Sequence, residues 1–184
     1  MTTNRRSFIH ATGLGLLSYT VAGTTALMSP RDARAKGADF CVLSDEEVGL
    51  IETFGEALAP GARENGIAHF IDQQLSVDAN DALLMIKYFN IRPPYVDFYR
   101  AGLTALNGYS HKLHDKPFTA LNDAAMNALI TTISGAVPEG WAGPPAPLFY
   151  LMVRSDAVDV VYGTAEGFER LGVPYMPHIV PPDL

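Results

Sequence analysis

The sequence predicts an all-α fold: a single compact helical domain of about six helices, followed by an extended, proline-rich C-terminal tail. Apolar residues recur at helical spacing through most of the chain. No segment shows the convincing alternation of apolar and polar residues that marks a half-buried strand. Residues 36–184 are long enough for one hydrophobic core, and neither a repeat nor a low-complexity tract suggests a second domain.

The first half of this domain predicts three helices. Ser44 and Glu47 form a capping-box pattern, in which each side chain bonds a free amide of the other residue, so a helix begins there and runs to about Leu58. The stretch GIAHFIDQQLS, residues 66–76, predicts a shorter helix. The stretch DANDALLMIKYF, residues 78–89, predicts another, capped near Asp78 or Asn80.

The second half predicts the longer helices. Pro93 and Pro94 suit the start of a helix over residues 95–114, because proline is tolerated in the first turn. Asn122 caps a helix that stops at Gly135, and a loop leads to the longest helical stretch, residues 147–172, with a potential break at Tyr162–Gly163. Four prolines interrupt the tail over residues 173–184, which excludes a regular element there.

The N-terminal region predicts a twin-arginine export signal over residues 1–35. Arg5 and Arg6 precede Phe8 and an uncharged segment that Gly, Ser and Thr make too weakly apolar for a typical membrane-spanning helix. Ala33 and Ala35 occupy the −3 and −1 positions of a small-x-small cleavage site, which predicts a cut after Ala35. The alternative is an anchor that is never cleaved. Either way, the chain would meet the twin-arginine translocase and work in the periplasm.

Charge and cysteine content exclude several classes of partner and cofactor. The chain has 13 basic and 20 acidic residues, and without residues 1–35 its net charge is about −10, which argues against nucleic acid and anionic membrane surfaces. Cys41 is the only cysteine, so a covalent haem, a four-cysteine iron–sulfur site and an internal disulfide are excluded. Cys41 is then either a buried thiol or one half of a disulfide with a partner chain.

Motifs for catalysis are weak, and we assign no catalytic, cofactor-binding or metal-binding residue in this chain. The sequence has no phosphate-binding loop, no H-E-x-x-H and no nucleophile elbow. His111 and His114, at i and i+3 beside Asp115, keep open a stand-alone metal-dependent enzyme. The competing interpretation is a set of exposed polar residues at a helix C-terminus. A module that binds a small molecule between helices is a further alternative.

Aromatic residues and the tail predict a protein–protein interface. Tyrosine offers an apolar body with a polar tip, and aromatic side chains are enriched where partners dock. An extended segment such as the tail has little reason to be ordered unless it lies against a partner. The predicted interface residues are Tyr95, Tyr99, Trp141, Tyr162, Pro174, Tyr175, Met176 and His178.

Three stretches together resemble the gluconate 2-dehydrogenase subunit 3 family: NRRSFIHATG, LSDEEVGLIETFGEALAPG and VYGTAEGFERLGVPYMPHIVPPD. The resemblance implies a non-catalytic small subunit without a redox centre. Its partner would be a large flavoprotein of the glucose–methanol–choline type that oxidises a sugar or sugar acid with FAD, and a cytochrome c would take the electrons onward. The signal of this "hitch-hiker" subunit would carry the folded flavoprotein to the periplasm, or to the periplasmic face of the inner membrane.

Overall fold

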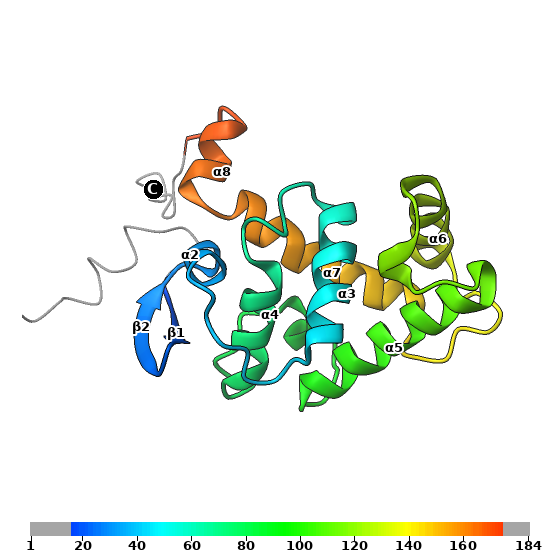
Figure 1. Ribbon diagram of the computed structural model, residues 1–184, viewed down its shortest axis with the longest axis horizontal. Helices are drawn as coiled ribbons and strands as arrows, with labels where there is room; N and C mark the ends of the chain where they lie inside the picture. Colours follow the sequence, from blue (N-terminus) through cyan, green and yellow to red (C-terminus); the bar gives the residue numbers. More distant parts are fainter. Residues whose placement is uncertain (1–15, 175–184) are drawn as a thin grey trace, which may run out of the picture.

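Helix α7, Ala146–Tyr162, runs through the middle of the molecule in the computed structural model, which describes residues 16–174 (Figure 1). Its buried residues recur at i, i+3, i+4 and i+7 and cover one broad face, whereas Arg154 and Val158 on the opposite side are exposed. The remaining helices are α2 (Pro30–Ala35), α3 (Asp45–Leu58), α4 (Ile67–Ser76), α5 (Tyr95–His114), α6 (Asp123–Gly135) and α8 (Ala165–Arg170), with short 3-10 turns η1 (Met85–Tyr88) and η2 (Phe118–Ala120).

The core lies where α3, α4 and α5 pack on α7. Phe149 of α7 stacks on Phe54 of α3 with ring centroids 5.7 Å apart. Gly102 lets α5 approach α7 closely, because a Cβ atom there would lie 2.1 Å from the ring of Phe149. The all-α prediction is therefore confirmed for the described residues apart from one small sheet.

Local sequence signals place most helix boundaries correctly. The capping box at the start of α3 is present, with the Ser44 amide donating to Glu47 Oε2 at 2.8 Å and the Glu47 amide to Ser44 Oγ at 3.3 Å. Asn122 caps α6 through the amide of Ala125. The long C-terminal stretch does break after Tyr162, and Thr164 caps the short α8 that follows.

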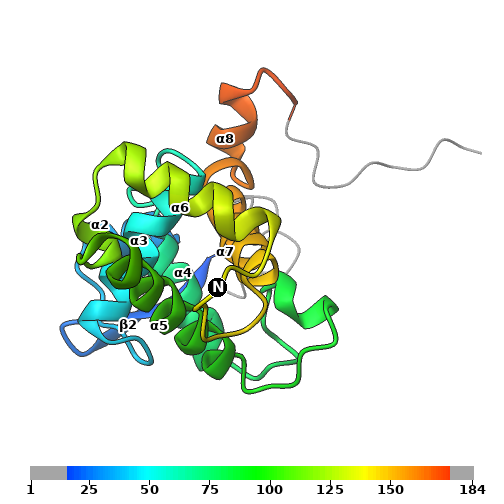
Figure 2. The same ribbon diagram turned by 90° about the vertical axis from the view of Figure 1, so that its right-hand side faces the viewer.

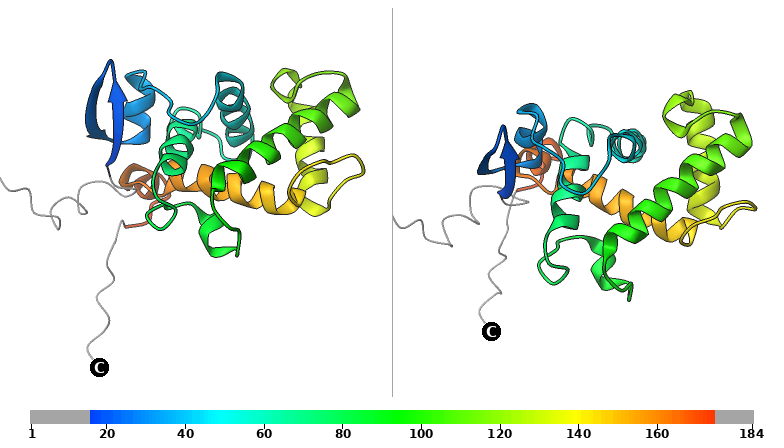
Figure 3. Two further views of the ribbon diagram at one scale, coloured as in Figure 1. Left: turned by 90° about the horizontal axis from the view of Figure 1, so that it is seen from below. Right: turned by 60° about the horizontal axis from the view of Figure 1, so that its bottom comes forward.

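The helix predicted over residues 78–89 is wrong: only Met85–Tyr88 forms a short 3-10 turn. The Asp78 carboxylate accepts the amide of Asn80, which stabilises a turn instead of a helix start. The amide of Leu83 donates at 2.6 Å to the side chain of Gln74 on α4, so a neighbouring element takes the hydrogen bond that a helix would need. The segment projects from the body of the molecule (Figures 2 and 3).

A β-hairpin that the sequence did not predict lies beside α2 at one end of the molecule (Figures 1 and 3). Strands β1, Leu17–Val21, and β2, Thr24–Met28, pair antiparallel with Leu17 opposite Met28. Ala22 and Gly23 connect them with φ of 47° and 78°, the left-handed pair that a tight two-residue hairpin turn uses. Within residues 16–174, no helix is both long and apolar enough to cross a membrane.

Candidate partner-binding surface

Large apolar side chains are displayed together on the segment between α4 and α5. Leu83 is 53 % exposed, Met85 38 %, Tyr88 76 % and Phe89 40 %. We call these four residues the apolar loop surface. Single exposed apolar residues are ordinary on protein surfaces, but four large ones within seven consecutive positions suggest a contact site for another molecule.

The loop holds this surface in a fixed form because every second residue is anchored in the core. Ala82, Leu84 and Ile86 are buried, so the residues between them point outward. The Lys87 ammonium donates to the carbonyl oxygens of Asn80 and Ala82 and so closes the loop on itself. A surface that is already ordered costs less conformational entropy to bind than a disordered segment does.

A cleft of about 520 Å³ lies at the base of this loop. Both polar and apolar groups line it, and Tyr95, one of the predicted interface residues, is among them. Its lining residues come from the end of α4, from the first part of the loop and from the residues that precede α5: Gln74, Leu75, Val77, Asp78, Ala79, Asn80, Pro93, Pro94 and Tyr95.

The structure places three of the predicted interface aromatics in the core. Tyr99 is completely buried, and Tyr95 and Trp141 are 8 % and 9 % exposed. The Trp141 indole donates to the carbonyl oxygen of Pro144 at 2.6 Å, and its ring lies near Tyr109 and Phe149. These side chains stabilise this chain itself, and Tyr95 also lines the surface cleft.

The other predicted site residues are distributed over the surface and beyond the described residues. Tyr162 is half-buried at the end of α7, and Pro174 is exposed. Tyr175, Met176 and His178 of the tail, and Arg5, Arg6 and Phe8 of the predicted signal, lie outside the described residues. Of the predicted cleavage site, Ala33 is completely buried in α2 and Ala35 is exposed at the end of that helix.

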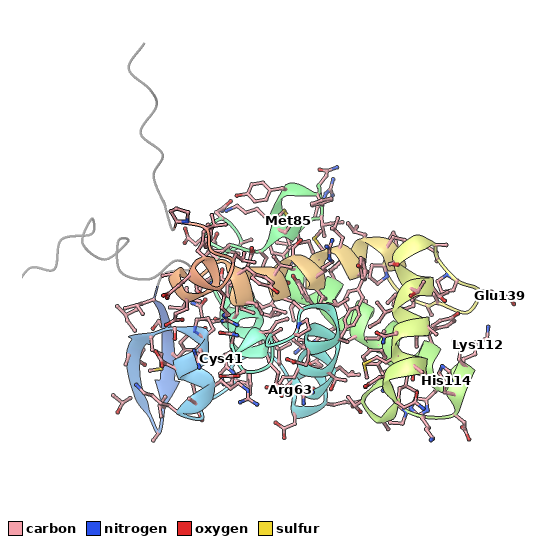
Figure 4. The ribbon with its side chains drawn as sticks, turned by 90° about the horizontal axis from the view of Figure 1, so that it is seen from above. Cys41, Arg63, Met85, Lys112, His114 and Glu139 are labelled. Atoms are coloured by element: carbon pink, nitrogen blue, oxygen red, sulfur yellow. The ribbon has the colours of Figure 1, made fainter. Side chains whose placement is uncertain are left out.

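Cys41 is exposed, and its backbone is held in place by α4. The Asp72 carboxylate accepts the amides of Cys41, Val42 and Leu43 at 2.9, 2.8 and 2.8 Å. A carboxylate that binds three amides fixes the chain just before α3. The thiol of Cys41 is thus displayed near the end of the molecule that carries the hairpin (Figure 4).

Three buried polar side chains each leave one atom without a hydrogen-bond partner among the described residues: Tyr19 at its hydroxyl, His69 at Nδ1 and Asp156 at Oδ1. The Tyr99 hydroxyl donates to Asp156 Oδ2 at 2.6 Å, whereas Asp156 Oδ1 has no partner among the described residues. Burial raises the pKa of Asp156 to about 8 and, together with the nearby carboxylate, raises that of Tyr99. His69 lies within 3.3 Å of the Ala38 carbonyl oxygen through Nε2, and burial lowers its pKa.

The predicted metal-ligand candidates do not form a metal site. His111 and Asp115 are exposed, and His114 lies half-exposed in the last turn of α5. In the part of the chain that the structure describes, no three His, Cys, Asp or Glu side chains gather where they could hold a metal ion. His114 and Lys112 lie at the far end of the molecule from Cys41 (Figure 4).

The apolar loop surface could have been suspected from the sequence. The segment has too many large apolar residues for the single apolar stripe of a surface helix: Leu83, Leu84, Met85, Ile86, Tyr88 and Phe89. Which of them face outward depends on the anchoring by Gln74 and on the burial of Leu84 and Ile86, and these contacts come from elements distant in the sequence.

Comparison with known proteins gives one match. The model of the family described as gluconate 2-dehydrogenase subunit 3 matches residues 45–181, which include the apolar loop surface and most of the helical core. No curated protein matches the chain, and no solved structure does.

Proposed function

Because the chain belongs to the gluconate 2-dehydrogenase subunit 3 family, we propose that it is the non-catalytic small subunit of a periplasmic FAD-dependent dehydrogenase complex that oxidises a sugar or a sugar acid. The family match over residues 45–181 is the observation that carries this proposal. A protein described as subunit 3 works within a multi-subunit dehydrogenase, so its own surface must recognise at least one other chain.

In this proposal the chemistry belongs to the partner. The large flavoprotein holds FAD and takes the hydride equivalent from the substrate, and a cytochrome c subunit carries the electrons away. This chain binds and stabilises the flavoprotein and, through Arg5 and Arg6, brings it to the twin-arginine translocase. The disulfide between Cys41 and a partner stays a prediction that its exposed thiol permits.

The apolar loop surface is our choice for the contact with the large subunit. Its exposed side chains match the apolar, aromatic-rich centre that protein interfaces show. The cleft at its base adds a concave neighbour into which a side chain of the partner can insert. The predicted contacts of Tyr162, Pro174, Tyr175, Met176 and His178 remain part of the proposal as a second region.

A matched pair of leucine substitutions tests this assignment. Leu83 and Leu113 are 53 % and 49 % exposed, but Leu113 lies on α5, next to Lys112 and His114 and away from Met85 (Figure 4). Leu83→Glu should weaken the complex by on the order of 2 kcal/mol, because a charge is buried at the centre of the interface. Leu113→Glu should leave the affinity unchanged.

The measurement is co-purification from native periplasm through a tag at Leu184, with an absorbance scan and mass spectrometry of the eluate. The expected eluate is yellow and contains a large flavoprotein whose yield falls in Leu83→Glu alone. Equal yields from both variants would move the interface elsewhere on the molecule. A colourless single chain from the unsubstituted protein would contradict the subunit function itself.

A further inference from the structure

Residues 16–38 form a second small core of their own against α4. Tyr19 of β1, Met28 of β2, Ala33 of α2 and Ala38 are buried together, and Leu17 packs on both this cluster and the main core. The hairpin and α2 lie together at one end of the molecule (Figures 1 and 3). A large part of the predicted export signal is therefore built into the folded chain.

Helix α2 has its own stabilising contacts at each turn. Ser29 caps it by accepting the amide of Asp32 at 3.1 Å, and Pro30 occupies its first turn. Arg31 pairs with Glu64 at 2.9 Å, and Arg34 pairs with Glu52 of α3 at 3.3 Å. The Ala33 side chain, between these two arginines, has no exposed surface.

Both ends of α2 are fitted to the N-terminal half of α4. At the start, Gly66 approaches so closely that a Cβ atom there would lie 2.2 Å from the Pro30 carbonyl oxygen. Just beyond the end, the His69 ring contacts the Ala38 carbonyl oxygen and lies 4.4 Å from the ring of Phe40, centroid to centroid. Such close packing indicates that this segment is part of the folded domain.

We infer that folding closes the predicted cleavage site, so that residues 17–38 remain a permanent part of the subunit and the bond after Ala35 is not cut. A peptidase binds its substrate as an extended strand and places the −3 and −1 side chains in its own pockets. Here the −3 residue, Ala33, is helical and completely buried, so cleavage requires that α2 first unfolds. The twin-arginine route delivers chains already folded, so the peptidase would meet the closed form.

This inference departs from the cut after Ala35 that the small-x-small pattern predicts. A cleavage motif in a sequence predicts processing only where the segment is accessible and extended. The same residues are not a substrate when they form a helix that packs on its neighbours. The N-terminus of the exported subunit should then lie before Leu17.

Intact-mass spectrometry of the exported, C-terminally tagged full chain is the first test. The expected mass includes residues 17–35. A chain that begins at Lys36 would overturn the inference. If this chain is recovered only from the cytoplasm, the result contradicts the export proposed above. The inference about the cleavage site then depends on the proteolysis experiment described next.

Trypsin provides a second test, because Arg31, Arg34 and Lys36 place its sites within the same stretch. In the purified full chain, cuts after these residues should be at least about 100-fold slower under native conditions than in urea. Equal rates in the two conditions would overturn the inference. This measurement needs neither export nor a partner, so its result stands whether or not the proposed function holds.

Two glycine variants show whether the contact with α4 gives the protection. Gly66 and Gly172 have φ of 78° and 66°, so alanine strains the backbone similarly at both positions. Only at Gly66 would the new Cβ atom meet the Pro30 backbone, since nothing lies within 4 Å of it at Gly172. Gly66→Ala should speed cleavage after Arg34 and Lys36 by about tenfold, and Gly172→Ala should not. Identical rates in both variants and in the unsubstituted chain would contradict the inferred docking of α2 on α4.

Discussion

Asp156 is completely buried in the core, and its Oδ1 has no partner among the described residues. Burial raises its pKa from 3.8 to about 8, and the Tyr99 hydroxyl bonded to Oδ2 only partly offsets this. At neutral pH the folded chain therefore holds a proton that the unfolded chain has released. Such a group makes the folded state less stable as the pH rises.

Asp156→Asn should remove this pH dependence, since an amide resembles the neutral acid in shape and does not ionise. Between the two pKa values the unfolded chain binds fewer protons than the folded chain, so the free energy of unfolding of the unsubstituted protein falls as pH rises from 3.8 to about 8. Urea titrations at about pH 5 and about pH 9 measure this fall. Between the two pH values, the free energy of unfolding of the unsubstituted protein should decrease by about 1–3 kcal/mol more than that of the variant. Parallel stability curves would show that Asp156 is already ionised in the folded chain.

In the loop between α4 and α5, a single side chain from a neighbouring helix favours an extended segment over a helix. Gln74 is buried, and its carbonyl oxygen takes the amide of Leu83. That bond fixes the register in which Leu84 and Ile86 face inward and Leu83 and Met85 face outward. The apolar loop surface thus depends on a residue that is not part of it.

Gln74→Ala should loosen the loop while the helices stay intact. The amide of Leu83 loses its acceptor, so hydrogen exchange over residues 82–89 should become about tenfold faster, and binding of the large subunit should weaken with it. Ser76→Ala is the matched control at the same end of α4, because the hydroxyl of Ser76 makes only a local bond to the carbonyl of Gln73. Unchanged exchange in Gln74→Ala would mean that Leu84 and Ile86 alone hold the loop.

Elements stabilised by their own sequence were predictable, and elements stabilised by distant contacts were not. The start of α3 follows from Ser44 and Glu47, two residues three positions apart that bond each other, and the cap of α6 follows from Asn122. The hairpin and α2 pack on α4, and although Ser29 caps α2 locally, their composition resembles that of an export signal and hid this cap. Likewise, Tyr99 could be recognised as an aromatic residue, but its bond to Asp156, 57 positions away, could not be foreseen.

At the scale of the whole molecule, α7 joins the two ends, with α6 near one end and α8 near the other (Figure 1). The apolar loop surface lies on a projection from this body (Figures 2 and 3). Residues 16–35, the described part of the predicted export signal, lie at the end that carries the hairpin (Figures 1 and 3). The proposed export and the proposed partner binding would therefore depend on different parts of the molecule, and separate substitutions should change each of them.

Arg5→Lys combined with Arg6→Lys should keep both this chain and its flavoprotein in the cytoplasm, because the translocase reads the arginine pair and the charge alone does not replace it. Cell fractionation with flavin absorbance and immunoblotting measures both proteins. Arg31→Lys is the control, since it retains a charge outside the pair. Continued export of the flavoprotein in the double variant would contradict the escort function, even if the two proteins still form a complex.

The apolar loop surface also bears on how much of this subunit a cell can tolerate. A chain made in excess of its partner would keep Leu83, Met85, Tyr88 and Phe89 in contact with water, and such patches promote self-association and aggregation. Balanced synthesis of the two subunits would avoid this, and so would prompt degradation of unassembled chains. The same four residues that favour assembly would therefore make the solubility of this protein a measure of how much partner is present.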